Sequence, residues 1–133
     1  MYQLDVSNQS HILNLAERVE QQFGRLDILF NNAAILYDTW QNAVNADLDV
    51  VNQAMITNLF GPWRLSQVFI SMMKRNKYGH IVNVLSLGDS LHHMSGAIPA
   101  YGVSKVALNA LTRILAAELR GTGNWLMLLI QDG

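Results

Sequence analysis

The sequence predicts an α/β fold built on a parallel sheet. Apolar, strand-like runs alternate along the chain with segments of helical periodicity, which is the order that βαβ units require. The runs at 26–31 and 80–85 are apolar almost throughout, as expected of strands that are buried on both faces. With 133 residues, 50% of them hydrophobic, the chain has the size and composition of a single domain, residues 1–133.

Strands and helices are predicted to alternate from end to end. The predicted strands are residues 2–6, 26–31, 80–85 and 125–130. The predicted helices run from Ser7 or Asn8 to about Phe23, from about Asp47 to about Arg75, and from Pro99 to Leu119. Gly24 ends the first helix, because glycine tolerates the left-handed backbone of a helix C-terminus. Pro62 lacks an N–H, so a break or kink is expected near 58–62.

The predicted helix at 99–119 carries a tyrosine and a lysine whose spacing suits proton transfer. Tyr101 and Lys105 are one helical turn apart, so both side chains leave the same face. A lysine ammonium favours the phenolate and so lowers a tyrosine pKa that is ordinarily ~10. Such a tyrosine can exchange a proton with a substrate oxygen near neutral pH. Taken alone, the spacing also suits a structural helix whose lysine extends along apolar surface to solvent.

Composition excludes several classes of function. The net charge is −1 and Lys/Arg clusters are absent from the sequence, which argues against nucleic acid or an anionic membrane as a partner. Neither a run of 18 apolar residues nor a signal-peptide pattern occurs, and the sequence has no cysteine, which fits a cytoplasmic protein. His92 and His93 have no third ligand at metal spacing, so we expect solvated loop histidines and no metal site.

Five motifs occur in the order and spacing of a known enzyme family. They are L-D-V (4–6), L-D-I-L-F-N-N-A-A (26–34), T-N-L-F-G-P (57–62), G-H-I-V-N-V-L-S (79–86) and Y-G-V-S-K (101–105). Together they resemble the short-chain dehydrogenase/reductase family, and the stretch around Y-G-V-S-K is most similar to its carbonyl-reductase-like branch. The resemblance implies a Rossmann-like doubly wound parallel sheet. It also implies an NAD(P)-dependent oxidoreductase that interconverts a small-molecule carbonyl and a secondary alcohol.

The resemblance assigns catalytic roles to four residues. Tyr101 would be the general acid for reduction or base for oxidation, while Lys105 would lower its pKa and hold the nicotinamide ribose, with Tyr101 beside the cofactor. Ser86, fifteen residues before the tyrosine, would hydrogen-bond the substrate carbonyl. Ser90 is the alternative candidate for this role. Asn58 would be the fourth member, its backbone carbonyl anchoring a water on a proton path to Lys105. Alternatively, Asn58 satisfies the backbone at the helix break.

The resemblance also assigns cofactor contacts. Asn32, Ala33 and Ala34 lie in N-N-A-A, which matches the family's N-N-A-G and would let the backbone approach the dinucleotide. Asp5 and Val6 match the L-D-V motif whose aspartate contacts adenine. Both NADP and NAD remain open, because the residues that discriminate between them follow a strand that has no counterpart here.

Parts of the family pattern are missing. No segment matches the glycine-rich T-G-x-x-x-G-x-G turn that holds the pyrophosphate, so the first two strands are expected to be absent and cofactor affinity weak. After residue 123 the sequence departs from the family, which suggests a frameshift in an incomplete reading frame; the nucleotide sequence tests this.

Two other functional interpretations stay open. The chain can be a truncated, inactive remnant or a subunit-contact fragment. An extended-class epimerase acting on nucleotide sugars is disfavoured by N-N-A-A and by the short spacing to Y-G-V-S-K. By analogy, a homodimer would form through the helices at 59–75 and 100–120.

Overall fold

Three parallel strands form one sheet in the computed structural model, which describes residues 1–86, 94–122 and 124–132, with backbone only for 86 and 124–132. The strands are β1 (Ile28–Asn31), β2 (Tyr78–Ser86) and β3 (Asn124–Asp132), in the order β1-β2-β3. Ile28 pairs with His80, and Val82 pairs with Leu128. The predicted parallel sheet is confirmed.

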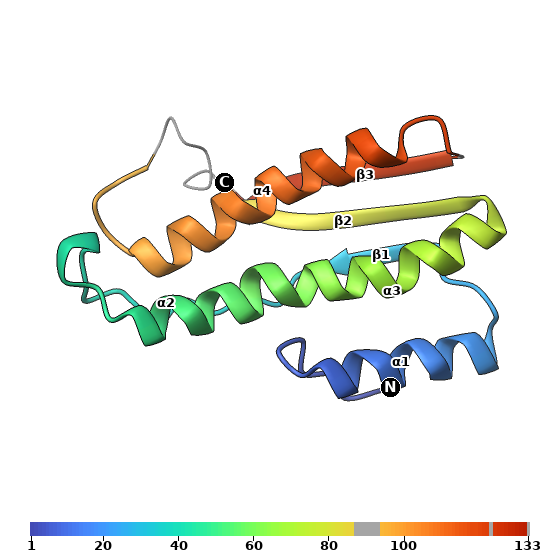
Figure 1. Ribbon diagram of the computed structural model, residues 1–133, viewed down its shortest axis with the longest axis horizontal. Coiled ribbons are helices and arrows are strands. Elements are labelled where there is room, and N and C mark those ends of the chain that lie inside the picture. The colour runs from blue at the N-terminus through green and yellow to red at the C-terminus, as the bar shows by residue number, and fades with distance from the viewer. Residues whose placement is uncertain (87–93, 123, 133) are drawn as a thin grey trace.

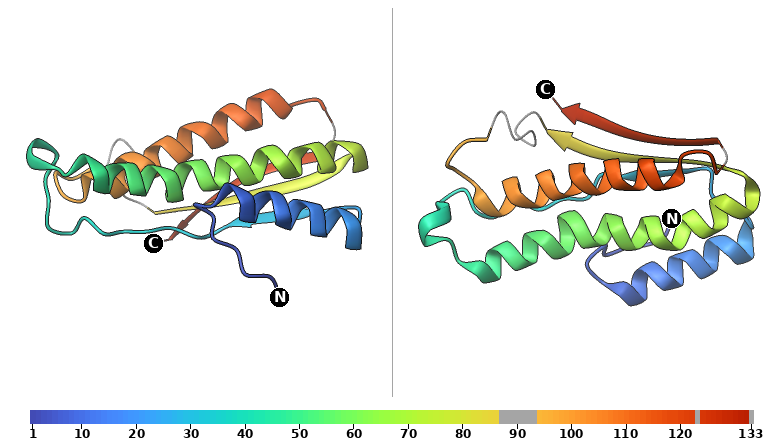
Figure 2. Two further views of the ribbon diagram at one scale, coloured as in Figure 1. Left: turned by 60° about the horizontal axis from the view of Figure 1, so that its bottom comes forward. Right: turned by 45° about the horizontal axis from the view of Figure 1, so that its top comes forward.

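The described helices are α1 (Gln9–Gln22), the 3₁₀ helix η1 (Ala43–Asn45), α2 (Leu48–Met55), the π-helix η2 (Ile56–Phe60), α3 (Gly61–Asn76) and α4 (Pro99–Leu119). Of these, α1, α3 and α4 cover the same face of the sheet (Figures 1 and 2). Because the strand order runs in one direction and βαβ crossovers are right-handed, successive crossover helices fall on one side.

The other face of the sheet differs from the expectation of strands covered on both sides. Ile28 and Phe30 point to this face and are 57% and 54% exposed. Leu29 packs against the core on the helical side, and Asn31 is buried there. Within the described ranges, the second helical layer of a doubly wound sheet is therefore not present.

Local sequence signals place α1 correctly but fail for the strand before it. The Asn8 side chain caps α1 by accepting a hydrogen bond from the His11 N–H at 3.2 Å, and Gly24 follows the helix at φ 67°. The prediction of a strand at 2–6 is wrong. A strand needs a neighbour to satisfy its backbone, and in the described chain none lies beside this segment. Leu4 and Val6 pack instead against the core.

The predicted break near 58–62 is a π-helical segment inside one long rod formed by α2, η2 and α3 (Figure 1). The Gly61 N–H donates to the Ile56 carbonyl, five residues earlier, so the helix takes up one extra residue. Pro62 has no N–H and cannot donate to the Asn58 carbonyl as a regular helix requires. The helix therefore widens where it was expected to break, and Asn58 turns inward and is buried.

Two apolar clusters form the core between the helices and the sheet. The first joins α1, α3 and β2 through Ile12, Val19, Leu65, Phe69, Met72, Met73 and Ile81. The second joins η2, β2 and α4 through Leu59, Leu85, Leu108, Leu111 and Leu115. The second cluster holds α4 against β2 and so sets the height of that helix above the sheet.

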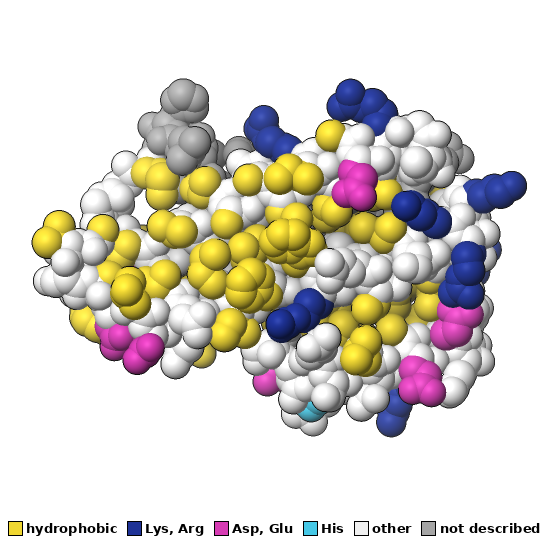
Figure 3. Space-filling model, in the orientation of Figure 1, with side chains coloured by type: hydrophobic (Ala, Val, Ile, Leu, Met, Phe, Trp, Pro, Cys, Tyr) yellow, Lys and Arg dark blue, Asp and Glu magenta, His cyan; other side chains and the backbone are white. Residues whose placement is uncertain are grey.

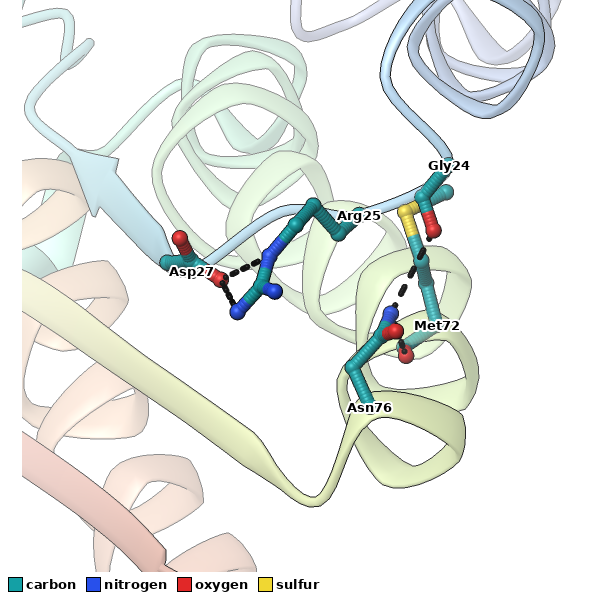
Figure 4. Close-up of polar contacts among 5 residues, drawn as sticks. All are labelled: Gly24, Arg25, Asp27, Met72 and Asn76. Carbon is teal, nitrogen blue, oxygen red and sulfur yellow. Dashed lines mark hydrogen bonds and ion pairs between the residues drawn. The ribbon is translucent and has the colours of Figure 1, made fainter.

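Polar contacts close the amino-terminal end of the sheet (Figure 4). Asn76, at the end of α3, donates from Nδ2 to the carbonyls of Gly24 at 3.3 Å and Met72 at 2.9 Å. Arg25 and Asp27 form an ion pair at 2.7 Å just before β1. The Asn76 bonds tie the turn between α1 and β1 to α3.

An exposed ion pair between α1 and α3 makes stability depend on acid pH. Arg75 donates to both Glu20 carboxylate oxygens, at 3.0 and 2.6 Å, and these hydrogen bonds lower the pKa of Glu20. A lowered pKa contributes stability above the unfolded-state value of ~4.3, and this contribution is lost as the pH falls through the lower folded-state pKa. We expect Arg75→Gln to lower the melting temperature slightly at neutral pH. Thermal scans should show this difference disappear once the pH falls below the lowered pKa of Glu20; a difference of constant size at every pH would contradict this account.

Candidate active site at the carboxyl ends of the strands

β1 and β2 run in parallel, and their carboxyl ends point toward the end of the molecule where α4 begins (Figure 1). In parallel α/β sheets, ligands bind beyond these ends of the strands. The loop that follows β1 starts with Asn32, Ala33 and Ala34, all exposed. The residues predicted for catalysis and for cofactor binding come from the elements that border this end.

Tyr101 and Lys105 lie together, as their spacing predicts. The Lys105 Nζ is 5.8 Å from the centroid of the Tyr101 ring, within the range of a cation–π contact. The same Nζ donates a hydrogen bond to the Val84 carbonyl of β2 at 2.8 Å. Lys105 is 4% exposed, so its charge acts on the ring from a largely desolvated position, where electrostatic effects are stronger than in water.

Asn58 clamps the loop after β1 to α4. Its Oδ1 accepts from the Ile35 N–H at 2.8 Å, and its Nδ2 donates to the Ile35 carbonyl at 3.0 Å and to Ser104 Oγ at 2.9 Å. Ser104 Oγ in turn donates to the Tyr101 carbonyl at 2.8 Å. Sequence reasoning did not single out Ser104, which links Asn58 to the helical turn that carries Tyr101 and Lys105.

A second buried polar chain lies beneath the site. Asn31 Nδ2 donates to Asn83 Oδ1 at 2.8 Å, and Asn83 Nδ2 donates to Thr112 Oγ1 at 2.8 Å. Thr112 Oγ1 donates to the Leu108 carbonyl at 2.7 Å. This chain joins β1, β2 and α4. Asparagine inside the otherwise apolar runs L-F-N-N and I-V-N-V is the signal that could have predicted it, because a buried amide needs partners.

The segment predicted to contact adenine lies beside an open pocket of about 520 Å³. The pocket is lined by Asp5, Ser7, Ile35, Tyr37, Gln53, Ile56 and Thr57. Asp5 Oδ1 accepts from Ser7 Oγ at 2.6 Å and from the Ser7 N–H at 2.9 Å, and these bonds lower the pKa of Asp5. Val6 packs against Gly61, where an added Cβ would lie 2.9 Å from the Val6 carbonyl oxygen. The structure thus brings residues 5–6 next to the loop that follows β1.

The structure does not describe every residue predicted for the site. The Ser86 side chain, Ser90, His92 and His93 are outside the described residues, although the backbone of residue 86 ends β2. Among the residues whose side chains are described, no group of three or more metal-ligating side chains forms. In the same part of the chain, no helix combines the length and apolarity needed to span a bilayer.

A family model described as "Enoyl-(Acyl carrier protein) reductase" matches residues 1–124. Short-chain dehydrogenase srdE of Neurospora crassa is 35% identical over 130 residues, which cover 97% of this chain and 43% of that protein. The chain belongs to the short-chain dehydrogenase/reductase family. An uncharacterized oxidoreductase of Thermotoga maritima is 38% identical over 108 residues. The match covers 78% of this chain and 40% of that protein.

Solved structures of short-chain dehydrogenases show the same architecture. NAD⁺-bound xylitol dehydrogenase has a TM-score of 0.89 and 27% identity, covering 99% of this chain and 49% of that one. A metagenomic short-chain oxidoreductase in complex with NADP has a TM-score of 0.87 and 29% identity, with 99% and 58% coverage. This short-chain dehydrogenase/reductase chain spans 43% of srdE and 49% of the xylitol dehydrogenase.

Proposed function

We propose that residues 1–133 are one partial domain of an NAD(P)-dependent oxidoreductase that interconverts a carbonyl and a secondary alcohol, of the carbonyl-reductase-like type. The observation that carries the proposal is the buried Lys105 ammonium beside the Tyr101 ring, at the end of the sheet where ligands bind. The NAD⁺-bound and NADP-bound structural neighbours support NAD or NADP as the cofactor.

The described pocket fits the adenosine part of such a dinucleotide. Ile35 and Ile56 supply apolar walls, and the Asp5 carboxylate can accept a hydrogen bond from an exocyclic amino group. Ala33 and Ala34 are exposed and directly precede Ile35, which lines this pocket. These residues would hold the cofactor, with Lys105 bonding to the ribose beside the nicotinamide.

Proton transfer is the step that this chain's own side chains would perform. A bound nicotinamide supplies or accepts the hydride. In reduction, Tyr101 would donate its phenolic proton to the substrate oxygen while Lys105 stabilises the phenolate that remains. Ser86 would donate a hydrogen bond to the same oxygen, and the Asn58 carbonyl would hold a water that re-supplies the proton through Lys105.

A second candidate is a non-catalytic remnant or a subunit-contact fragment. The half-exposed Ile28 and Phe30 favour it, because apolar sheet residues of a complete domain are normally covered. Figure 3 shows hydrophobic side chains gathered over α3 and α4, where Trp63, Val103 and Ile114 are exposed. This surface supports a homodimer through the helices at 59–75 and 100–120, which sedimentation velocity would measure.

Binding of AMP tests the cofactor part of the proposal without requiring turnover. We expect weak binding, with Kd ~1 mM or above, because nothing in the 133 residues matches the glycine-rich pyrophosphate motif. NMR titration should shift the amides of Asp5, Ile35 and Thr57 selectively. Asp5→Ala should weaken these shifts, whereas Asp49→Ala, which removes an exposed carboxylate of α2, should not.

Two outcomes would contradict this expectation. Shifts scattered over the surface would contradict adenosine binding in the pocket. A micromolar Kd for AMP, measured by calorimetry, would contradict the prediction of weak binding.

A further inference from the structure

Asp38 is a buried carboxylate that the proposed chemistry does not use. It lies in the loop between β1 and η1 and is 0% exposed. Its Oδ2 accepts a hydrogen bond from the Ala100 N–H at 2.6 Å and lies 3.5 Å from Gln41 Nε2. No described residue hydrogen-bonds to its Oδ1. Burying a carboxylate costs free energy unless the group is hydrogen-bonded. We therefore expect the bond between Asp38 and Ala100 to stabilise the local structure.

The start of α4 cannot cap itself. Its N-cap residue, Ile98, has φ 49° and an apolar side chain that accepts no hydrogen bond. The first intrahelical bond runs from the Gly102 N–H to the Ile98 carbonyl at 2.9 Å, so the Ala100 N–H precedes the regular ladder. Asp38, 62 residues earlier in the chain, supplies the missing acceptor. Its negative charge also suits the positive end of the helix dipole.

The loop that carries Asp38 is fixed to α4 at two points. Asp38 holds Ala100, and Asn58 joins Ile35 of the same loop to Ser104. Tyr101 lies between these two attachments, one residue after Ala100. Tyr101 therefore lies on a turn of α4 that is held on both sides by the loop after β1.

We propose that Asp38 is a positioning residue: it caps α4 from the loop after β1 and thereby holds Tyr101 against Lys105. The inference rests on the proposed function, in which these two side chains move the proton. Without the cap, the first turn of α4 frays and the ring of Tyr101 leaves the Lys105 ammonium. The loop that begins at the cofactor motif would then be the physical link between dinucleotide binding and the proton donor.

Amide hydrogen exchange measured by NMR on the whole chain tests the cap. In Asp38→Ala we expect exchange at Ala100 and Gly102 to accelerate about tenfold, as for the loss of one N-cap, with Leu111 exchange unchanged. Asp38→Asn should restore protection, because the amide oxygen still accepts from Ala100. The matched control is Asp47→Ala, which removes the exposed N-cap of α2 and should leave α4 protected.

The second readout reports position directly. A nuclear Overhauser effect between the Tyr101 ring protons and the Lys105 ε-methylene should weaken in Asp38→Ala and persist in Asp38→Asn. If Asp38→Ala does not fold, Asp38→Ser replaces it and should give an intermediate effect. Unchanged exchange at Ala100, or equal effects of the alanine and asparagine variants, overturns the inference. Neither readout needs turnover, so retained turnover in Tyr101→Phe would refute the proposed function without touching the cap.

Discussion

Replacing Asn58 by leucine is expected to lower the free energy of unfolding by about 2–5 kcal/mol, because buried polar partners are left without hydrogen bonds. The side chain is fully buried and satisfies the N–H and carbonyl of Ile35 as well as Ser104 Oγ. Leucine has a similar volume, so the cavity contribution is small. Urea unfolding followed by tryptophan fluorescence measures the change.

The matched control is Asn52→Leu, six residues earlier on the same rod, where the side chain is exposed. A substitution at such a surface position usually changes stability by no more than about 0.5 kcal/mol. If both variants unfold alike, the three hydrogen bonds of Asn58 contribute nothing measurable. A stable Asn58→Leu chain would then favour the role that depends only on the Asn58 backbone carbonyl, which any residue can supply.

Lys105→Met is expected to change proton chemistry far more than stability. Methionine keeps most of the aliphatic stem but removes the charge that lies 5.8 Å from the Tyr101 ring. The pKa of Tyr101 should rise toward its ordinary value of ~10. Any reductase or dehydrogenase activity should fall by about 10²–10⁴, the contribution typical of a tuned general acid or base.

Stability should respond weakly, because removal of a buried ammonium relieves a desolvation penalty and offsets the lost bond to Val84. NMR titration of the Tyr101 ring carbon that bears the hydroxyl gives the pKa, and thermal unfolding gives the stability. Lys74→Met, an exposed lysine in the last turn of α3, is the control. An unchanged Tyr101 pKa in Lys105→Met would refute the assigned role of the lysine.

Sequence reasoning worked where the cause of structure is local. The Asn8 cap and Gly24 terminator bound α1, and α4 runs from Pro99 to Leu119 as predicted. Helical spacing predicts the Tyr101–Lys105 pairing provided that the first turn of α4 is formed. The predicted strand at 2–6 is not formed, because a strand depends on a neighbour that local sequence cannot supply.

The contacts that hold the candidate site were less accessible from sequence. Asp38 reaches Ala100 across 62 residues, and Asn58 reaches Ser104 across 46. Such contacts depend on topology and on the extra residue of η2, which turns Asn58 inward. The resemblance assigns a site role to Asn58. It assigns none to Ser104, although Ser104 lies within Y-G-V-S-K, and none of the five motifs contains Asp38.

The strand order β1-β2-β3 runs in one direction across the sheet, starting from β1. Among the described strands β1 pairs only with β2, so its other edge is free. A strand that joins this edge through a right-handed crossover running the opposite way places its helix over Ile28 and Phe30. The same reversal opens a crevice above the end of β1, beside Asn32, where dinucleotides bind in sheets wound both ways. Such a strand and its helix would together cover Ile28 and Phe30 and border the proposed cofactor site.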